Sequence, residues 1–134
     1  MRITHVLETH IHNDYVTGGR ALANETGATY HVNADDEVSF ERVGVRDGDV
    51  VTVGSMSVTV LATPGHTFTH LSYVVTPADG SEPAVFTGGS LLFGSTGRPD
   101  LLGPDHTEAL ARAGLAARGV VFTTFGLIAL RLAL

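Results

Sequence analysis

Two histidine-containing loops, each placed directly after a predicted strand, constrain the fold of this chain more than any other feature. The first loop is ETHIHNDYVTGG, which carries His10, His12 and Asp14 and follows a predicted strand over residues 3–7. The second is TPGHTFTHLSY, in which a Pro-Gly turn delivers His66. Loops at the ends of strands carry the functional side chains of α/β folds. The pattern therefore indicates an α/β fold whose chemistry lies at the ends of its strands.

The rest of the pattern predicts short helices and several strands. Residues 16–26 favour a helix that ends at Gly27. Gly54-Ser55 joins two alternating runs and predicts a hairpin. A second helix is predicted to begin near residues 104–105 and to run to about Ala113. The strands after the first are predicted at residues 28–32, 50–53, 57–62, 71–75 and 84–87.

The composition excludes several classes of function. The chain has 134 residues, which suits one domain, and 43% of them are hydrophobic, which allows a core. With 8 basic and 14 acidic residues the formal charge is −6, which argues against a nucleic-acid partner. Cysteine is absent, so neither a disulfide nor a thiolate ligand is available. Any metal site must therefore use histidine, carboxylate and water.

The ends of the chain give no sign of a membrane partner. The N-terminal MRITHVLETH lacks the pattern of a signal peptide, so a cytoplasmic location is the default prediction. The last residues, GVVFTTFGLIALRLAL, are nearly all apolar. They are shorter than the about 20 residues that a membrane-spanning helix needs, so a buried strand or helix is predicted there.

The spacing of the first loop has a mechanical interpretation. In an extended segment His10 and His12 point to the same side, because side chains alternate with a period of two, and Asp14 continues the series. Imidazole nitrogen suits zinc, iron and other first-row metals. An isolated H-x-H can equally be a pair of surface histidines. The second loop with His66 favours a metal site over that alternative.

Three segments in order carry a resemblance to a known family: THVLETHIHNDYVTGG, TPGHTFTHLSY and FTGGSLLFGSTGRPDLLG. They resemble the metallo-β-lactamase superfamily, and most closely its persulfide dioxygenases and their glyoxalase II relatives, whose bacterial members are often fused to rhodanese domains. The resemblance covers about residues 2–113. It implies an αββα sandwich with the metal site at one edge between the sheets.

Compared with that family, the chain looks truncated. Relatives have strands before the first histidine motif and a further strand that leads to a late histidine. We therefore expect a partial domain over residues 1–113, followed by an atypical apolar tail over residues 114–134. Missing strands would leave an exposed edge and exposed core surface, so self-association into a homo-oligomer is a further expectation.

The resemblance also implies which residues bind the metal ion. His10 and His66 match family metal ligands, with His12 and Asp14 as further ligands or orienting groups. The family's first motif ends in a histidine where this chain has Tyr15, which puts a second metal ion in question. Its third motif holds a ligating aspartate where this chain has Gly89, so the usual set of two histidines and one carboxylate is incomplete. Asp14 or water is left to fill that position.

Four more residues are candidates for supporting the site or the substrate. His70 resembles a histidine that supports the site in relatives, with a simple packed histidine as the alternative. Tyr15 is placed either to hydrogen-bond a ligand or to pack. Arg98 and Asp100 match a G-R-T-D segment of relatives and predict a loop-bracing ion pair; alternatively, Arg98 holds a carboxylate of a thiol tripeptide. The remaining histidines are predicted to be isolated, on a strand or the surface: His5, His31 and His106.

The resemblance implies three hypotheses for function. The leading one is a persulfide dioxygenase-like enzyme, which uses one divalent metal, iron(II), and oxygen to oxidise a low-molecular-weight thiol persulfide to sulfite. The first alternative is a zinc-dependent thioester hydrolase of the glyoxalase II type, in which Asp14 orients or deprotonates a water. The second alternative is a non-catalytic truncated remnant, for which Gly89 argues.

Overall fold

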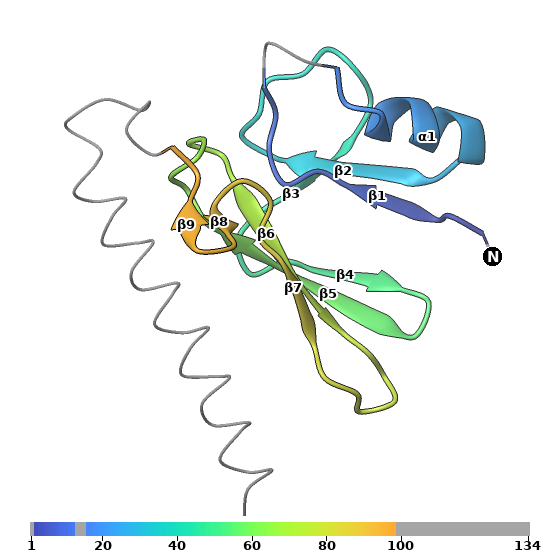
Figure 1. Cartoon of the computed structure of the whole chain (residues 1–134). Coiled ribbons are helices and arrows are strands. Elements are labelled where there is room, and N and C mark those ends of the chain that lie inside the picture. Colours follow the sequence, from blue (N-terminus) through green and yellow to red (C-terminus); the bar gives the residue numbers. More distant parts are fainter. Residues whose placement is uncertain (1, 13–15, 99–134) are drawn as a thin grey trace, which may run out of the picture.

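A computed structural model describes residues 2–12 and 16–98, which contain one helix and nine strands (Figure 1). The helix and the two larger sheets build three layers. The predicted helix near residues 104–113 and the apolar tail, residues 114–134, lie outside the described residues. The elements are, in order, β1 (His5–Leu7), α1 (Gly19–Thr26), β2 (Thr29–Asn33), β3 (Val43–Val45), β4 (Val50–Val53), β5 (Met56–Ala62), β6 (Leu71–Thr76), β7 (Ala84–Phe86), β8 (Leu91–Leu92) and β9 (Ser95–Thr96).

The first sheet is parallel and has the order β1-β2-β3. Helix α1 connects β1 to β2 and covers one face of this sheet, as a crossover between parallel strands requires. The central strand β2 is buried on both faces. Its residues Tyr30 and Val32 pack with Ala23 of α1. The alternating residues His31 and Asn33 are also buried, on the opposite face.

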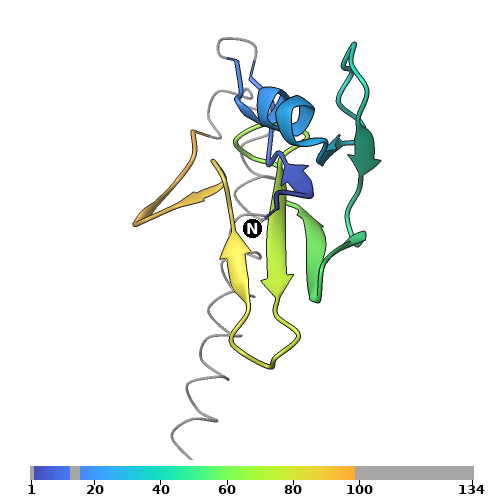
Figure 2. The ribbon, with the colours of Figure 1, turned by 90° about the vertical axis from the view of Figure 1, so that its right-hand side faces the viewer.

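The second sheet is antiparallel, has the order β4-β5-β6-β7 and packs on the first. Val58 and Val60 of β5 and Leu71 and Tyr73 of β6 form the centre of this core, and Val45 of β3 meets them from the first sheet. The helix, the parallel sheet and the antiparallel sheet are thus the three layers. The short β8–β9 hairpin, drawn in orange, projects from the side of the molecule (Figure 2).

The prediction of a mixed α/β fold is confirmed, and so are the predicted helix end at Gly27 and the predicted hairpin turn at Gly54-Ser55. Gly27 ends α1 with a φ of 68°, and its N–H donates to the carbonyl of Ala23. The Gly54-Ser55 turn joins β4 and β5, as predicted. Helix α1 begins at Gly19, three residues later than predicted, because the Thr17 hydroxyl accepts a hydrogen bond from the Gly19 N–H and holds the preceding chain outside the helix.

Two features were not predicted. Strand β3 lies in the polar stretch of residues 33–49, where its three residues show no readable alternation. Strands β8 and β9 lie between the last predicted strand, residues 84–87, and the helix predicted to begin near residue 104. Of the two helical layers in the predicted αββα sandwich, α1 supplies one within the described part of the chain. In that same part, no helix is long and apolar enough to cross a membrane.

Candidate metal centre

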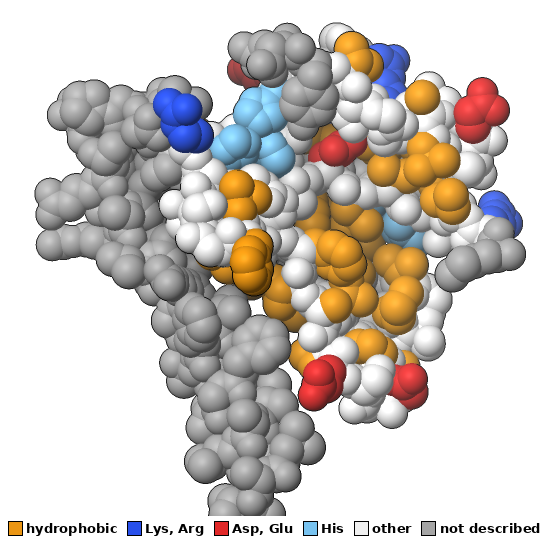
Figure 3. Space-filling model, viewed as in Figure 1, with side chains coloured by type: hydrophobic (Ala, Val, Ile, Leu, Met, Phe, Trp, Pro, Cys, Tyr) orange, Lys and Arg blue, Asp and Glu red, His pale blue; other side chains and the backbone are white. Residues whose placement is uncertain are grey.

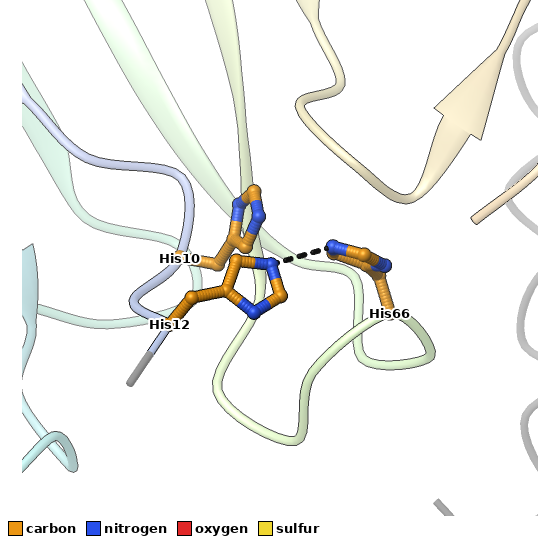
Figure 4. Close-up of side chains that lie close together, drawn as sticks. All are labelled: His10, His12 and His66. Carbon is orange, nitrogen blue, oxygen red and sulfur yellow. Dashed lines mark hydrogen bonds between the residues drawn. The ribbon is translucent and has the colours of Figure 1, made fainter. Parts of the chain in front are cut away.

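Three histidines from two loops converge at one point (Figure 4). His10 and His12 lie in the segment after β1, and His66 lies in the loop between β5 and β6. Their potential ligand nitrogens all lie within 4.8 Å of one another. The Nε2 atoms of His12 and His66 are 2.9 Å apart. Each of these three histidines is therefore close enough to the other two to share one ion, and histidine side chains, in pale blue, gather at the surface on this side of the molecule (Figure 3).

The first histidine loop is held at its base by the side chain of Glu8. Carboxylate oxygen Oε1 of Glu8 accepts a 2.7 Å hydrogen bond from the Thr17 hydroxyl and a 2.9 Å bond from the Tyr30 hydroxyl. Thr17 lies just before α1 and Tyr30 in β2, so Glu8 ties both ends of the loop to the first sheet. Sequence reasoning missed Glu8. Its position directly after a predicted strand and two residues before His10 was the available signal.

Strand β6 of the second sheet forms hydrogen bonds with the backbone of residues 8–9, directly before His10. The Tyr73 hydroxyl donates a 2.6 Å hydrogen bond to the Glu8 carbonyl, and burial raises the pKa of Tyr73, with the Glu8 charge adding to the effect. The N–H of Leu71 donates to the carbonyl of Thr9 at 2.7 Å. The backbone immediately before His10 is therefore bonded to both sheets.

The second histidine loop, residues 63–70, is closed by its own backbone. The Thr63 N–H donates to the His70 carbonyl at 2.9 Å, and the Gly65 N–H donates to the Thr67 carbonyl at 3.1 Å. Gly65 has a φ of 153°, which L side chains rarely adopt, so glycine is required at the turn that delivers His66.

The environment of the cluster favours neutral imidazole. Burial lowers the pKa of His10, and His66 and His12 lower it further, while Glu8 opposes them. Burial, followed by the effect of His12, also lowers the pKa of His66. Neutral imidazole is the form that binds a metal ion, so these shifts keep the ligand form available to lower pH than an ordinary histidine would.

His70 lies directly behind the cluster. It is almost fully buried, and its ring stacks on that of His10 with centroids 4.8 Å apart. Its Nε2 accepts a hydrogen bond from the Gly89 N–H, so the neutral ring carries its proton on Nδ1, which points at the Thr63 and Ser90 hydroxyls at 2.9 and 3.2 Å. Burial lowers the pKa of His70 to about 4, with His10, His66 and His12 contributing. Both nitrogens are thus occupied within the protein.

Gly89 lies against the ring of His66. A Cβ added at Gly89 would overlap that ring and lie 2.7 Å from its Nε2. A Cβ on Gly97 would lie 2.9 Å from Nδ1 of the same ring. The space that a side chain at residue 89 would need is therefore occupied by the imidazole of His66.

The residues present fit one divalent metal ion. The two Nε2 atoms of His12 and His66 lie so close that at most one of them carries a proton, and a cation can replace that proton. Nδ1 of His66 is buried without a hydrogen-bond partner among the described residues. The His10 ring makes a 2.8 Å contact through Nδ1 with the Thr9 hydroxyl, which leaves Nε2 as its ligand atom. Three imidazoles form a donor set that zinc and other first-row metals accept.

Of the four remaining site candidates, Arg98 alone is among the described residues. Three of them lie outside the described part of the chain: Asp14, Tyr15 and Asp100. Arg98 is exposed and directly follows Gly97. His5 and His31, which were expected to be isolated, stack on each other with centroids 5.4 Å apart, and His31 is buried.

Comparison with known sequences finds relatives over most of the chain. The profile of the metallo-β-lactamase superfamily matches residues 1–123. The hydroxyacylglutathione hydrolase of Pseudomonas entomophila (strain L48) is 36% identical over 93 residues, which are 69% of this chain and 35% of that protein. The corresponding enzyme of Pseudomonas putida (strain W619) is 34% identical over 119 residues, which are 87% of this chain and 45% of that protein. The chain spans less than half of the length of these relatives.

Solved structures give the same result for the fold. A metallo-β-lactamase from Staphylococcus aureus subsp. aureus COL superposes with a TM-score of 0.75 at 30% identity, over 90% of this chain and 38% of that one. ETHE1 from Myxococcus xanthus superposes with a TM-score of 0.61 at 42% identity, over 73% of this chain and 40% of that one.

Proposed function

The chain belongs to the metallo-β-lactamase superfamily, and we propose that its three-histidine cluster binds one divalent metal ion that acts on a small thiol-derived substrate. The observation that carries this proposal is the approach of His10, His12 and His66 to within 4.8 Å of one another through their ligand nitrogens. The neutral form favoured at His10 and His66 supports it.

The donor set favours zinc-dependent thioester hydrolysis. Catalytic zinc sites combine three protein ligands with an open position, and among the described residues the cluster consists of imidazoles alone. The curated relatives named above are hydrolases of hydroxyacylglutathione, whose acyl group is held in a thioester. When bound here, zinc would polarise the thioester carbonyl and lower the pKa of water toward neutrality.

The residues of the chain would then have distinct tasks. His10, His12 and His66 would hold the metal ion as neutral ligands. His70 would keep the Gly89 backbone against His66 by accepting the Gly89 N–H. Asp14 stays the predicted group that orients or deprotonates the water. Hydrolysis adds that water across the thioester and yields a carboxylic acid and a free thiol.

Persulfide oxidation is the second candidate, and the sequence motifs favour it. The three motif segments resemble persulfide dioxygenases most closely, and ETHE1 from Myxococcus xanthus superposes on the chain at 42% identity. This reaction would use iron(II) and oxygen and yield sulfite. Non-haem iron sites of this class commonly combine two histidines with one carboxylate. Asp14 is the carboxylate that this candidate requires.

Metal content measured on anaerobically purified protein tests the shared part of both candidates. We expect about one metal ion per chain in the wild type and none in a His10→Ala, His66→Ala double variant. Apoprotein reloaded with zinc is then assayed with a hydroxyacylglutathione thioester. Apoprotein reloaded with iron(II) is assayed for oxygen uptake with a glutathione persulfide.

The outcomes separate the hypotheses. Thioester cleavage by the zinc form, lost in the double variant, supports the hydrolase, whereas persulfide-dependent oxygen uptake by the iron form supports the dioxygenase. A wild type that binds no metal above the level of the double variant rejects both and leaves a non-catalytic remnant.

We also propose that the chain self-associates. Phe86 on the edge strand β7 is 58% exposed, and Phe93 between β8 and β9 is fully exposed, which supports contact with a second copy. Light scattering on the purified chain tests this, and a monomer at micromolar concentration would contradict it.

A further inference from the structure

The loop that carries His66 is tied to the first sheet through Thr69. The Thr69 carbonyl accepts a 2.7 Å hydrogen bond from the side-chain amide of Asn33, at the end of β2. The Thr69 hydroxyl donates a 2.6 Å hydrogen bond to Oδ1 of Asp36, three residues further along. One residue of the second histidine loop is therefore bonded twice to the turn after β2.

That turn is itself well fixed. The Asp36 N–H donates to the Asn33 carbonyl, and the Asp35 N–H donates to Oδ1 of Asn33. The Arg42 guanidinium donates to the carbonyls of Ala34 and Asp36 at 3.2 and 2.9 Å. Asn33 is buried. The turn thus offers Thr69 a rigid pair of partners rather than two mobile surface groups.

Two residues beyond Thr69, the loop is bonded to the other histidine segment, because the Leu71 N–H donates to the carbonyl of Thr9. Thr9 directly precedes His10. The short stretch 69–71 is therefore anchored both to the turn after β2 and to the chain after β1. His66 lies three residues before Thr69, and its Nε2 is 2.9 Å from the Nε2 of His12.

We propose that Thr69, held by Asn33 and Asp36, is a positioning residue that sets the approach of His66 to His12. The hydrogen bonds of Thr69 described above go to Asn33 and Asp36, so Thr69 would act on His66 through the loop backbone. The part of this inference that concerns metal affinity rests on the proposed function. The part that concerns the contact between the two rings does not.

The test compares Thr69→Val, which removes the hydroxyl at nearly constant volume, with Thr69→Ser, which keeps it. Asp36→Ala removes the same hydrogen bond from the other side. Thr26→Val is the matched control, because the Thr26 hydroxyl also makes one hydrogen bond, to the Leu22 carbonyl in α1, away from the cluster. Circular dichroism and urea unfolding establish which variants are fully folded under the assay conditions.

Two readouts are used on the full chain. In metal-free protein, nuclear Overhauser effects between the ring protons of His12 and His66 report their contact. With cobalt(II) as the probe, the visible absorption spectrum reports the coordination geometry and its titration gives the affinity. We expect Thr69→Val and Asp36→Ala to weaken the ring-to-ring signal and lower cobalt affinity by about tenfold. Thr69→Ser, which keeps the hydroxyl, and Thr26→Val should both show the ring-to-ring signal and the cobalt affinity of the wild type.

The outcomes are distinct from those of the proposed function. A folded Thr69→Val variant that keeps both the ring-to-ring signal and the cobalt affinity overturns the positioning role. The role is equally overturned if Thr26→Val changes the readouts as much as Thr69→Val does. If the wild type binds no cobalt but loses the ring-to-ring signal on Thr69→Val, the positioning role stands and the proposed metal centre is rejected.

Discussion

At the scale of the residue, Gly89 determines how closely the His66 imidazole can lie to the backbone after β7. A Cβ at this position would overlap the ring, and the ring in turn makes the 2.9 Å contact with His12. The absence of a side chain is therefore not simply the loss of a ligand. It gives His66 the space that completes a set of three histidines.

We expect Gly89→Ala to weaken metal binding. The new methyl group must displace the His66 ring, which separates its Nε2 from that of His12. Disturbing the support of a metal ligand commonly costs 10- to 100-fold in affinity, so a loss of about tenfold in a cobalt(II) titration is the expected result.

Gly18→Ala is the control for this substitution. A Cβ at Gly18 meets nothing within 4 Å, and its φ of −74° suits alanine. If Gly89→Ala binds cobalt as tightly as Gly18→Ala, the ring of His66 does not depend on the space at Gly89.

The sequence predicted part of the cluster at this scale. The period of two in an extended segment placed His10 and His12 on one side, and they do lie together. The role of His70 could not be read in the same way. His70 accepts a hydrogen bond from the Gly89 N–H, and its Nδ1 faces the Ser90 hydroxyl; both partners lie about 20 residues further along the chain.

At the scale of the element, β2 contains a buried histidine that the site does not use. His31 is only 5% exposed, and neither ring nitrogen has a hydrogen-bond partner among the described residues. Burial, followed by the neighbouring His5, lowers its pKa. An unsatisfied buried polar group costs about 1–3 kcal/mol, so β2 carries a destabilising side chain in the middle of the parallel sheet.

We expect His31→Leu to raise the free energy of unfolding by about 1 kcal/mol at pH 7.5, as measured by urea denaturation. The advantage over wild type should grow as the pH falls below about 6.5, the ordinary histidine pKa. The sign follows because the folded state holds His31 neutral, so the unfolded wild type binds more protons and is favoured by acid. Other histidines are common to both proteins and cancel in the difference.

His5→Leu is the companion variant for this measurement. It removes the ring stacked on His31 but leaves the buried nitrogens in place. A His31→Leu protein with the same stability as wild type at both pH 7.5 and pH 5.5 would contradict the expected cost.

The elements themselves were predictable where one local signal dominates. Gly27 needs a positive φ and ends α1, and Gly54 needs one at the β4–β5 turn. Strand β3 escaped prediction because it is defined by pairing with β2 rather than by its own sequence. Strands β8 and β9 are two residues each, too short for an alternating pattern to appear.

At the scale of the whole molecule, the cluster links the two sheets. His10 and His12 follow a strand of the parallel sheet, and His66 precedes a strand of the antiparallel sheet. A metal ion held by all three would bind only when the sheets are packed together. Metal binding should therefore stabilise the folded chain by mass action.

We expect zinc at 100 times its dissociation constant to raise the free energy of unfolding by about 2.7 kcal/mol. Urea denaturation of apoprotein with and without zinc measures this difference. The His10→Ala, His66→Ala double variant should show no such increase. An equal gain in both proteins would mean that zinc acts elsewhere on the chain.

The distance along the chain between His12 and His66 has a consequence for the order of folding. These residues are 54 positions apart, whereas β4, β5 and β6 pair through hairpins between consecutive strands. Short-range pairing closes early and distant contacts close late, so the cluster should assemble after the main barrier to folding. In stopped-flow experiments, zinc should then slow unfolding and leave the folding rate nearly unchanged. Faster folding at a constant unfolding rate would instead make the histidine cluster part of the nucleus.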